Sequence, residues 1–148
     1  MASTLTNLVH HVVFSTKTRL NLIKPQFRGE LYSYICGTIK NEKGKMIRIG
    51  GMANHIHILA VFHPSITVSD MLRKIKGGSA KWLNDKYNQR FSWQRGYGAF
   101  SVSESVVPSV TKYIDNQDRH HAKMTFEEEY LALLRKHKIE FDERYIWD

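Results

Sequence analysis

Hydrophobic and polar positions recur along the chain with periods that distinguish strands from helices. Strands are expected where β-branched and aromatic residues gather or alternate with polar ones, at residues 9–15, 45–51, 54–62 and 97–103. Helices are expected where apolar residues return every three or four positions, at residues 24–41, 67–87, 105–121 and 126–137. The short connection at residues 51–53 is typical of a hairpin between the second and third strands.

The first six elements follow the order strand, helix, strand, strand, helix, strand. This order predicts an α+β fold of the ferredoxin-like, split βαββαβ type, with an antiparallel sheet and extra helices at the C-terminal end. We expect helices on one face of the sheet, which leaves the other face open for a ligand, a nucleic acid or a second subunit. Residues 1–148 are interpreted as a single domain, in which an acidic helix and tail begin at about residue 125.

The composition is that of a folded protein, with 42% hydrophobic residues and 3 Trp, 7 Tyr and 7 Phe. The single cysteine, Cys36, excludes an internal disulfide framework and a thiolate-rich zinc site. The most apolar run, residues 56–62, is too short to cross a bilayer and contains His57, and residues 1–7 lack the pattern of a signal peptide. We therefore expect a cytoplasmic protein that has no membrane partner.

Positive charge dominates, with 22 Lys and Arg against 14 Asp and Glu, which gives a formal net charge of +8. The excess is uneven. Residues 17–48 carry eight basic and two acidic side chains, residues 71–95 carry seven and one, and residues 127–148 carry four and seven. A basic body with an acidic tail favours a polyanionic partner, most simply a nucleic acid, although solvated surface helices produce the same pattern.

The third expected strand contains the sharpest local motif, His55-Ile56-His57. Because side chains alternate along a strand, His55 and His57 point to one face while Ile56 and Ile58 point to the other. Two imidazoles one pleat apart can bind one metal ion. The alternative is a pair of hydrogen-bonded or exposed histidines on an open strand, because the His-x-His spacing is common.

The expected helix at residues 105–121 carries Tyr113 and Gln117 four positions apart, and therefore on one face. Gln117 offers an amide oxygen as a third metal ligand, and Tyr113 offers a nucleophile beside it. The alternative for Tyr113 is a place in the apolar stripe of the helix. We interpret His120 and His121 as cations near a helix C-terminus, rather than as further ligands or phosphate contacts.

These motifs occur in a fixed order along the chain. His55-Ile56-His57 is followed by Gly96-Tyr97-Gly98 and then by Tyr113-x-x-x-Gln117. In this order they closely resemble the single-tyrosine HUH transposases of small bacterial insertion sequences, the group numbered two hundred and six hundred and five. The resemblance covers nearly the whole chain.

The resemblance implies an enzyme that cleaves and rejoins single-stranded DNA without ATP, at hairpins near the ends of an insertion sequence. It assigns the nucleophile to Tyr113 and one divalent metal, Mg²⁺ or Mn²⁺, to His55, His57 and Gln117. The ligand types alone leave zinc and nickel open as well. It also implies a homodimer in which the tyrosine helix of one subunit can serve the histidines of the other.

Attack by the Tyr113 oxygen on a phosphodiester would leave a 5′-phosphotyrosine and a free 3′-OH, and a second 3′-OH could then rejoin the strand. The tyrosine hydroxyl needs help to ionise at neutral pH, and the sequence names no general base. Trp93 and Tyr97 are candidates for base stacking, with core packing as the alternative for Trp93. The expected DNA contacts are cations of the second helix and of the turn and strand before the histidines: Lys43, Lys45, Arg48, Arg73, Lys74, Lys76 and Lys81.

Three other functions fit parts of the pattern. A domesticated, repeat-associated tyrosine transposase would carry the same residues. A rolling-circle type HUH nickase shares the histidine pair and the tyrosine, but usually has a longer chain. A non-catalytic ferredoxin-like nucleic-acid-binding module would need neither the metal nor the tyrosine.

Overall fold

The computed structural model describes residues 3–148 and contains four strands and five α-helices in that range. The strands are β1 (Val9–Ser15), β2 (Lys45–Met52), β3 (His55–Val61) and β4 (Gly98–Val102). The helices are α1 (Pro25–Asn41), α2 (Val68–Tyr87), α3 (Val107–Asp115), α4 (Gln117–His121) and α5 (Phe126–Lys136). Short 3-10 turns, η1 (Lys17–Arg19) and η2 (Glu104–Val106), precede α1 and α3. No helix within residues 3–148 has the length and apolar character needed to cross a membrane.

The strands form one sheet in the order β2-β3-β1-β4, and every neighbouring pair is antiparallel. This order arises because each helix connection skips one strand position. Helix α1 joins β1 to β2 past the position of β3, and α2 joins β3 to β4 past β1. The α+β, ferredoxin-like split βαββαβ fold expected from the sequence is therefore confirmed, as are the extra C-terminal helices.

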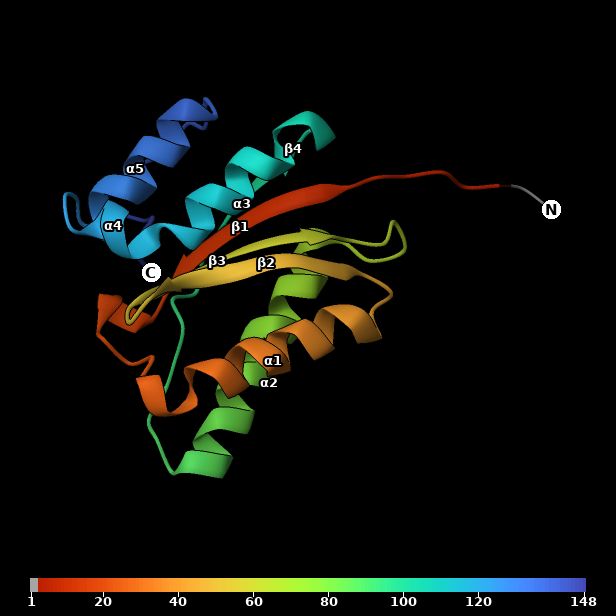
Figure 1. Ribbon diagram of the computed structural model, residues 1–148. Helices are drawn as coiled ribbons and strands as arrows, with labels where there is room; N and C mark the ends of the chain where they lie inside the picture. Colours follow the sequence, from red (N-terminus) through yellow and green to blue (C-terminus); the bar gives the residue numbers. More distant parts are fainter. Residues whose placement is uncertain (1–2) are drawn as a thin grey trace.

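Helices α1 and α2 cover one face of the sheet (Figure 1). The side chains of Val12, Phe14, Ile56 and Ile58 leave the strands toward this layer and are fully buried. They pack against the apolar stripes of the two helices, formed by Leu31, Ile35, Ile39, Met71, Leu72 and Ile75. Burial of this continuous apolar layer anchors β1 and β3 at the centre of the sheet.

The opposite face is not open, which corrects the expectation drawn from the sequence. Helices α3, α4 and α5 lie over it (Figure 1). Two apolar clusters attach them: Ile114 packs with Val9 and Leu59, while Phe126, Tyr130 and Leu134 pack with Val13 and Phe100. The physical reason is that the outward-facing positions of β1, β3 and β4 are themselves apolar away from the histidines, so this face also needs a cover.

The third expected helix, residues 105–121, is interrupted in the structure. It begins as the turn η2, continues as α3, and breaks at Asn116, which has φ −102° and ψ 22°. The Asn116 N–H is shared between the carbonyls of Lys112 and Tyr113, as is common where a helix ends. Ser105 does not cap α3, since it lies within η2 and its hydroxyl contacts that of Ser103.

The end of β2, next to the turn into β3, depends on Gly51, which pairs with Ile56 and has φ +154°. A Cβ on this residue would lie 2.3 Å from the carbonyl oxygen of His55. We expect Gly51→Ala to lower the free energy of unfolding by about 2 kcal/mol or more, because the clash is with backbone that has no room to move. Thermal denaturation measures the effect. Gly37→Ala is the control, since a Cβ at Gly37 meets nothing within 4 Å.

Candidate active site

The two histidines of β3 point together into the layer beneath α3, α4 and α5. His55 and His57 are both fully buried, and their ring centroids lie 5.2 Å apart. Ile56 and Ile58 point to the opposite layer, as the alternation of a strand requires. The paired orientation expected from the sequence is therefore present, and the histidines lie on a covered face rather than on an open strand.

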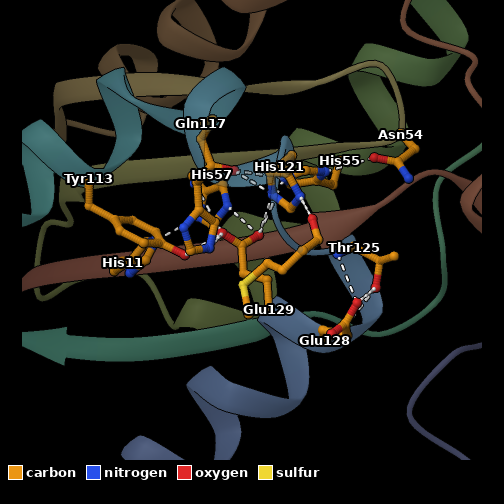
Figure 2. A network of polar contacts seen from close by, with 12 residues as sticks. His11, Asn54, His55, His57, Tyr113, Gln117, His121, Thr125, Glu128 and Glu129 are labelled. Atoms are coloured by element: carbon orange, nitrogen blue, oxygen red, sulfur yellow. Dashed lines mark hydrogen bonds and ion pairs between the residues drawn. The ribbon is translucent and has the colours of Figure 1, made fainter.

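The ends of α3 and α4 bring Tyr113 and Gln117 to the same place (Figure 2). Gln117 is buried, and its Oε1 lies 2.9 Å from His55 Nε2. The Tyr113 ring lies edge-on to His57, with centroids 5.7 Å apart. The break at Asn116 does not separate the two side chains, because both still face the histidine pair.

Glu129, from α5, lies at the centre of this cluster and is only 1% exposed (Figure 2). Its Oε1 lies 3.1 Å from His57 Nε2 and 3.4 Å from His55 Nε2. Its Oε2 accepts hydrogen bonds from the Tyr113 hydroxyl and from Gln117 Nε2, the latter at 3.0 Å. Sequence reasoning missed this residue, because it treated Glu129 only as part of the charge of the acidic C-terminal helix.

His120 and His121 lie in the last turn of α4, as expected, but their rings also contact the cluster, which the interpretation as C-terminal cations did not include. His121 Nε2 lies 3.0 Å from both Gln117 Oε1 and Glu129 Oε1. His120 Nε2 lies 3.2 Å from the Tyr113 hydroxyl and 3.3 Å from Glu129 Oε2.

Neighbouring groups contact the Nδ1 atoms of His55, His57 and His121 and so fix the orientation of these three rings. His55 Nδ1 contacts Asn54 Oδ1 at 2.8 Å, and His121 Nδ1 contacts the carbonyl oxygen of Met124 at 2.9 Å. His57 Nδ1 contacts His11 Nε2 at 2.8 Å. Partners of this kind hold the tautomer and the ring plane of a metal-binding histidine. All three Nε2 atoms consequently point into the space shared with Gln117 and Glu129.

Burial is the largest cause of the pKa shifts of His55, His11 and Tyr113, but it is outweighed at Glu129. Burial lowers the pKa of His55 to about 3 and the pKa of His11 to about 3. Electrostatic repulsion from His57 lowers both values further. Burial raises the pKa of Tyr113 well above its usual range, and the hydrogen bond to Glu129 raises it further. Burial alone would raise the pKa of Glu129, but hydrogen bonds and the charge of His57 outweigh it and hold that pKa well below its usual range. The site therefore contains a protonated phenol beside a charged carboxylate.

The side chains present fit a divalent metal. Glu129 Oε1 lies close to the Nε2 atoms of His55 and His57, and Gln117 Oε1 lies close to His55 Nε2. The histidines and the glutamine are the donors expected from the sequence. His55, His121 and Glu129 each place one ligand atom within 4.8 Å of the others. Nitrogen and oxygen donors of this kind suit manganese, zinc and related metals.

Two open spaces adjoin Tyr113. A cavity of about 760 Å³ is lined by Tyr113, His120 and three cationic side chains, Lys112, Arg119 and Lys123. A second cavity, of about 510 Å³, also reaches Tyr113 and has His11 and Leu133 in its lining. The nucleophile candidate is thus accessible from solvent, although the metal ligand candidates behind it are buried.

The cations expected to contact DNA are distributed over two regions. Arg73, Lys74, Lys76 and Lys81 belong to α2, which covers the face of the sheet opposite the histidines (Figure 1). Lys43 lies in the turn between α1 and β2, and Lys45 is the first residue of β2. Arg48, also on β2, pairs with Asp115 at 3.3 Å.

Several of these cations already have partners in the chain. Lys74 pairs with Glu42 at 2.6 Å, Lys81 with Asp85 at 2.8 Å, and Arg73 with Asp70 at 3.8 Å. Lys76 donates to the carbonyls of Arg95 and Gly96, and burial lowers its pKa to about 8.

Trp93 belongs to the core. It is 8% exposed, packs edge-on against Phe14 and Phe91, and donates a hydrogen bond from its indole nitrogen to Ser79 Oγ at 3.0 Å. Of the two stacking candidates, only Tyr97 remains partly exposed.

Comparison with known proteins places these observations in a family. The profile described as "Transposase IS200 like" matches residues 4–117. The transposase of insertion sequence IS200 from Salmonella typhimurium is 27% identical over 124 residues, which cover 79% of this chain and 81% of that protein. The ISDra2 transposase TnpA from Deinococcus radiodurans is 23% identical over 117 residues, covering 74% and 84%.

Two solved structures share the fold. A crystal structure from Deinococcus radiodurans R1, assigned as a transposase, has a TM-score of 0.64 at 20% identity and covers 79% of this chain and 95% of that one. A repeat-associated tyrosine transposase bound to a REP hairpin has a TM-score of 0.61 at 13% identity, covering 82% and 72%. The match to the family profile spans more than half of the chain, and this protein therefore belongs to the IS200-like transposase family.

Proposed function

We propose that this transposase cleaves and rejoins single-stranded DNA at insertion-sequence ends through a covalent bond to Tyr113. The observation that supports this most is the placement of the Tyr113 side chain in one cluster with His55, His57 and Gln117. A nucleophile next to a group of metal-binding side chains is the arrangement that phosphodiester cleavage requires.

The Tyr113 oxygen loses its proton, attacks phosphorus and forms an O–P bond, so that the phosphate joins Tyr113 to the 5′ end of the downstream strand. The bond from phosphorus to the 3′ oxygen breaks, and that oxygen leaves as a 3′-OH after taking up a proton. Because the phosphotyrosine retains the energy of the diester, a second 3′-OH can attack it and regenerate the Tyr113 hydroxyl. This exchange of one diester for another needs no ATP.

His55, His57 and Gln117 would hold the divalent metal, Mg²⁺ or Mn²⁺. When bound, the metal polarises the phosphate and neutralises charge on its non-bridging oxygens. The protein contributes ring orientation through Asn54 and His11, which contact the Nδ1 atoms of the two β3 histidines. Burial of both rings keeps water from competing for their Nε2 atoms.

The substrate strand would reach Tyr113 through the cavity lined by Lys112, Arg119 and Lys123. These cations lie beside the nucleophile, whereas the α2 cations lie on the other side of the sheet. We propose that the strand to be cut contacts the cavity, and that Lys43, Lys45, Arg48 and the α2 cations contact the hairpin. The hairpin-bound relative supports structured DNA ends as the substrate class.

The primary test is direct. Labelled single-stranded hairpin DNA is incubated with the protein and Mn²⁺, without ATP, and separated under denaturing conditions. A labelled protein band that survives denaturant supports the covalent mechanism. Binding without such an adduct would favour the non-catalytic nucleic-acid-binding alternative.

Arg119→Ala should weaken binding of unstructured single-stranded DNA by about 3- to 10-fold at low salt, because one phosphate contact is lost. Lys81→Ala, on α2, should leave that affinity unchanged and affect only hairpin DNA. Fluorescence anisotropy with both DNA types separates the two effects. A larger loss for Lys81→Ala on unstructured DNA would place the cleaved strand on α2 instead.

We further propose a homodimer whose active sites exchange the tyrosine helix. Strands β2 and β4 are the edges of the sheet, and an edge is a liability unless it is paired or covered. In the single chain Tyr113 lies beside His57 of the same chain. Exchange of the tyrosine helix would therefore require α3 and α4 to move together onto the partner subunit. The segment around η2, which joins β4 to α3, would be the hinge.

Mixed dimers of Tyr113→Phe and His57→Ala test the exchange. If the helix crosses over, one site of each mixed dimer combines intact histidines with an intact Tyr113, so cleavage should return when the two inactive proteins are co-expressed. Purified mixed dimers that bind DNA but remain inactive would contradict exchange and favour sites built within one chain.

A further inference from the structure

The structure assigns a metal-binding role to two residues beyond the motif, Glu129 and His121: we infer that they complete the ligand set begun by His55, His57 and Gln117. This inference rests on the proposed function and deepens it. Both residues lie after residue 117, where the match to the family profile ends. The added ligands are therefore supplied by α4 and α5 of this chain.

The distances between donor atoms support a shared cation. Metal–ligand bonds of about 2.1 Å place neighbouring donor atoms roughly 3.0 to 3.4 Å apart. Glu129 Oε1 lies 3.0 Å from His121 Nε2, 3.1 Å from His57 Nε2 and 3.4 Å from His55 Nε2. Gln117 Oε1 lies 2.9 Å from His55 Nε2 and 3.0 Å from His121 Nε2.

The hydrogen-bond directions favour a cation over a purely structural network. His121 donates from Nδ1 to the Met124 carbonyl, and His55 contacts Asn54 Oδ1 through Nδ1. In a neutral ring with its proton on Nδ1, the Nε2 atom carries only a lone pair. Both Nε2 atoms would then face the lone pairs of Gln117 Oε1 and Glu129 Oε1, an arrangement that is repulsive unless a positive charge lies between them.

A divalent ion among these donor atoms would face the lone pairs of His55, His121, Gln117 and Glu129 together, and would relieve this repulsion. The charge of Glu129 would further offset that of the ion, which Gln117 cannot do.

This ligand set implies a preference among metals. Three imidazoles, an amide oxygen and one carboxylate suit Mn²⁺ and the later first-row metals better than Mg²⁺, which favours oxygen donors and retains water. We therefore expect this chain to bind Mn²⁺ much more tightly than Mg²⁺, and to depend on α5 for that affinity.

Calorimetric titration of the full chain with MnCl₂, in the absence of DNA, tests the assignment. Glu129→Gln keeps the shape of the side chain but removes its charge, and should weaken Mn²⁺ binding at least about tenfold. His121→Ala should weaken it by a similar factor and provides a second variant if Glu129→Gln does not fold. Circular dichroism and thermal melting check the folding of each protein.

Glu127→Gln is the matched control, because it makes the same change on the same helix. Glu127 lies on the surface and pairs with Arg19 at 3.4 Å, so its replacement should leave Mn²⁺ affinity unchanged. Equal Mn²⁺ affinities for the wild type, folded Glu129→Gln and His121→Ala would overturn the inference. So would equal affinity of the wild type for Mg²⁺ and Mn²⁺.

Adduct formation distinguishes this failure from failure of the proposed function. A wild-type protein that forms the covalent adduct, together with variants whose Mn²⁺ affinity is unchanged, would contradict only the role of Glu129 and His121. Higher adduct yield in Glu129→Gln with unchanged Mn²⁺ affinity would show that the carboxylate restrains Tyr113 instead of binding metal. Absence of any adduct in the wild type would contradict the proposed function, whatever the titrations give.

Discussion

Tyr113→Phe is expected to fold and bind single-stranded DNA like the wild type, and to form no denaturant-stable adduct. The change removes only the hydroxyl oxygen, which is the atom that would bond to phosphorus. Loss of the nucleophile cannot be compensated by the remaining residues, because the other side chains of the cluster are occupied in binding or orienting one another. The expected effect on cleavage is therefore complete loss within the sensitivity of the assay.

Folding should survive because the ring keeps its contacts. The Tyr113 ring lies edge-on to His57 and His11 and belongs to the apolar cluster of Ile114 and Val110. Glu129 Oε2, which accepts the hydroxyl hydrogen bond, still accepts one from Gln117. The stability cost is about that of one hydrogen bond to a charged group, roughly 1.5–3 kcal/mol at most.

Tyr32→Phe is the matched control, since it removes a tyrosine hydroxyl from α1. That hydroxyl is buried and is the one buried side-chain polar atom within residues 3–148 that has no hydrogen-bond partner. Its removal should leave adduct formation intact and should not destabilise the protein. An adduct formed by Tyr113→Phe would assign the nucleophile to another residue.

The sequence predicted the parts of the site that follow from local periodicity. Alternation along one strand placed His55 and His57 on one face, and the structure shows both rings in the same buried layer. Spacing along a helix brought Tyr113 and Gln117 together, even though the helix is in fact two segments that meet at Asn116. The roles of these residues in metal binding and catalysis remain predictions.

Glu129 could not be found by the same reasoning, because its position depends on how α5 packs against the sheet. A weak signal existed. Thr125 and Glu128 form a capping box that fixes the start of α5. From that start, Glu129 falls within the stripe formed by Phe126, Tyr130 and Leu133, on the buried side of the helix. A carboxylate inside an apolar stripe indicates a specific partner, since burial of an unpaired charge is costly.

Charge counts were less informative than local periodicity. The basic residues of α2 predict DNA contacts, and the fold places α2 on the face opposite Tyr113, so this run of charge does not mark the cavity beside the nucleophile. The cations that do adjoin Tyr113, Lys112, Arg119 and Lys123, are spread over α3, α4 and the following turn and form no conspicuous run in the sequence. Only the packing of these helices over the sheet brings them to one cavity.

His57→Ala is expected to abolish adduct formation at any Mn²⁺ concentration and to weaken Mn²⁺ binding about 100-fold or more. His57 is fully buried at the centre of β3, and its Nε2 lies 3.1 Å from Glu129 Oε1. Alanine removes this donor atom from the centre of the cluster. It also removes the partner of His11 Nε2. Loss of a residue that only contacts a metal ligand lowers metal affinity about 10- to 100-fold, so loss of a ligand itself should lower it further.

His63→Ala controls for the general loss of a histidine. His63 follows β3 in an exposed loop, where its Nδ1 contacts the hydroxyl of Ser65. Its removal should change neither Mn²⁺ affinity nor adduct yield. DNA binding without metal should be similar in wild type, His57→Ala and His63→Ala, because the cations beside Tyr113 belong to other elements. If folded His57→Ala still forms the Tyr113 adduct in the presence of Mn²⁺, the reaction does not depend on the histidine pair, and the metal-dependent mechanism is wrong even if the nucleophile is right.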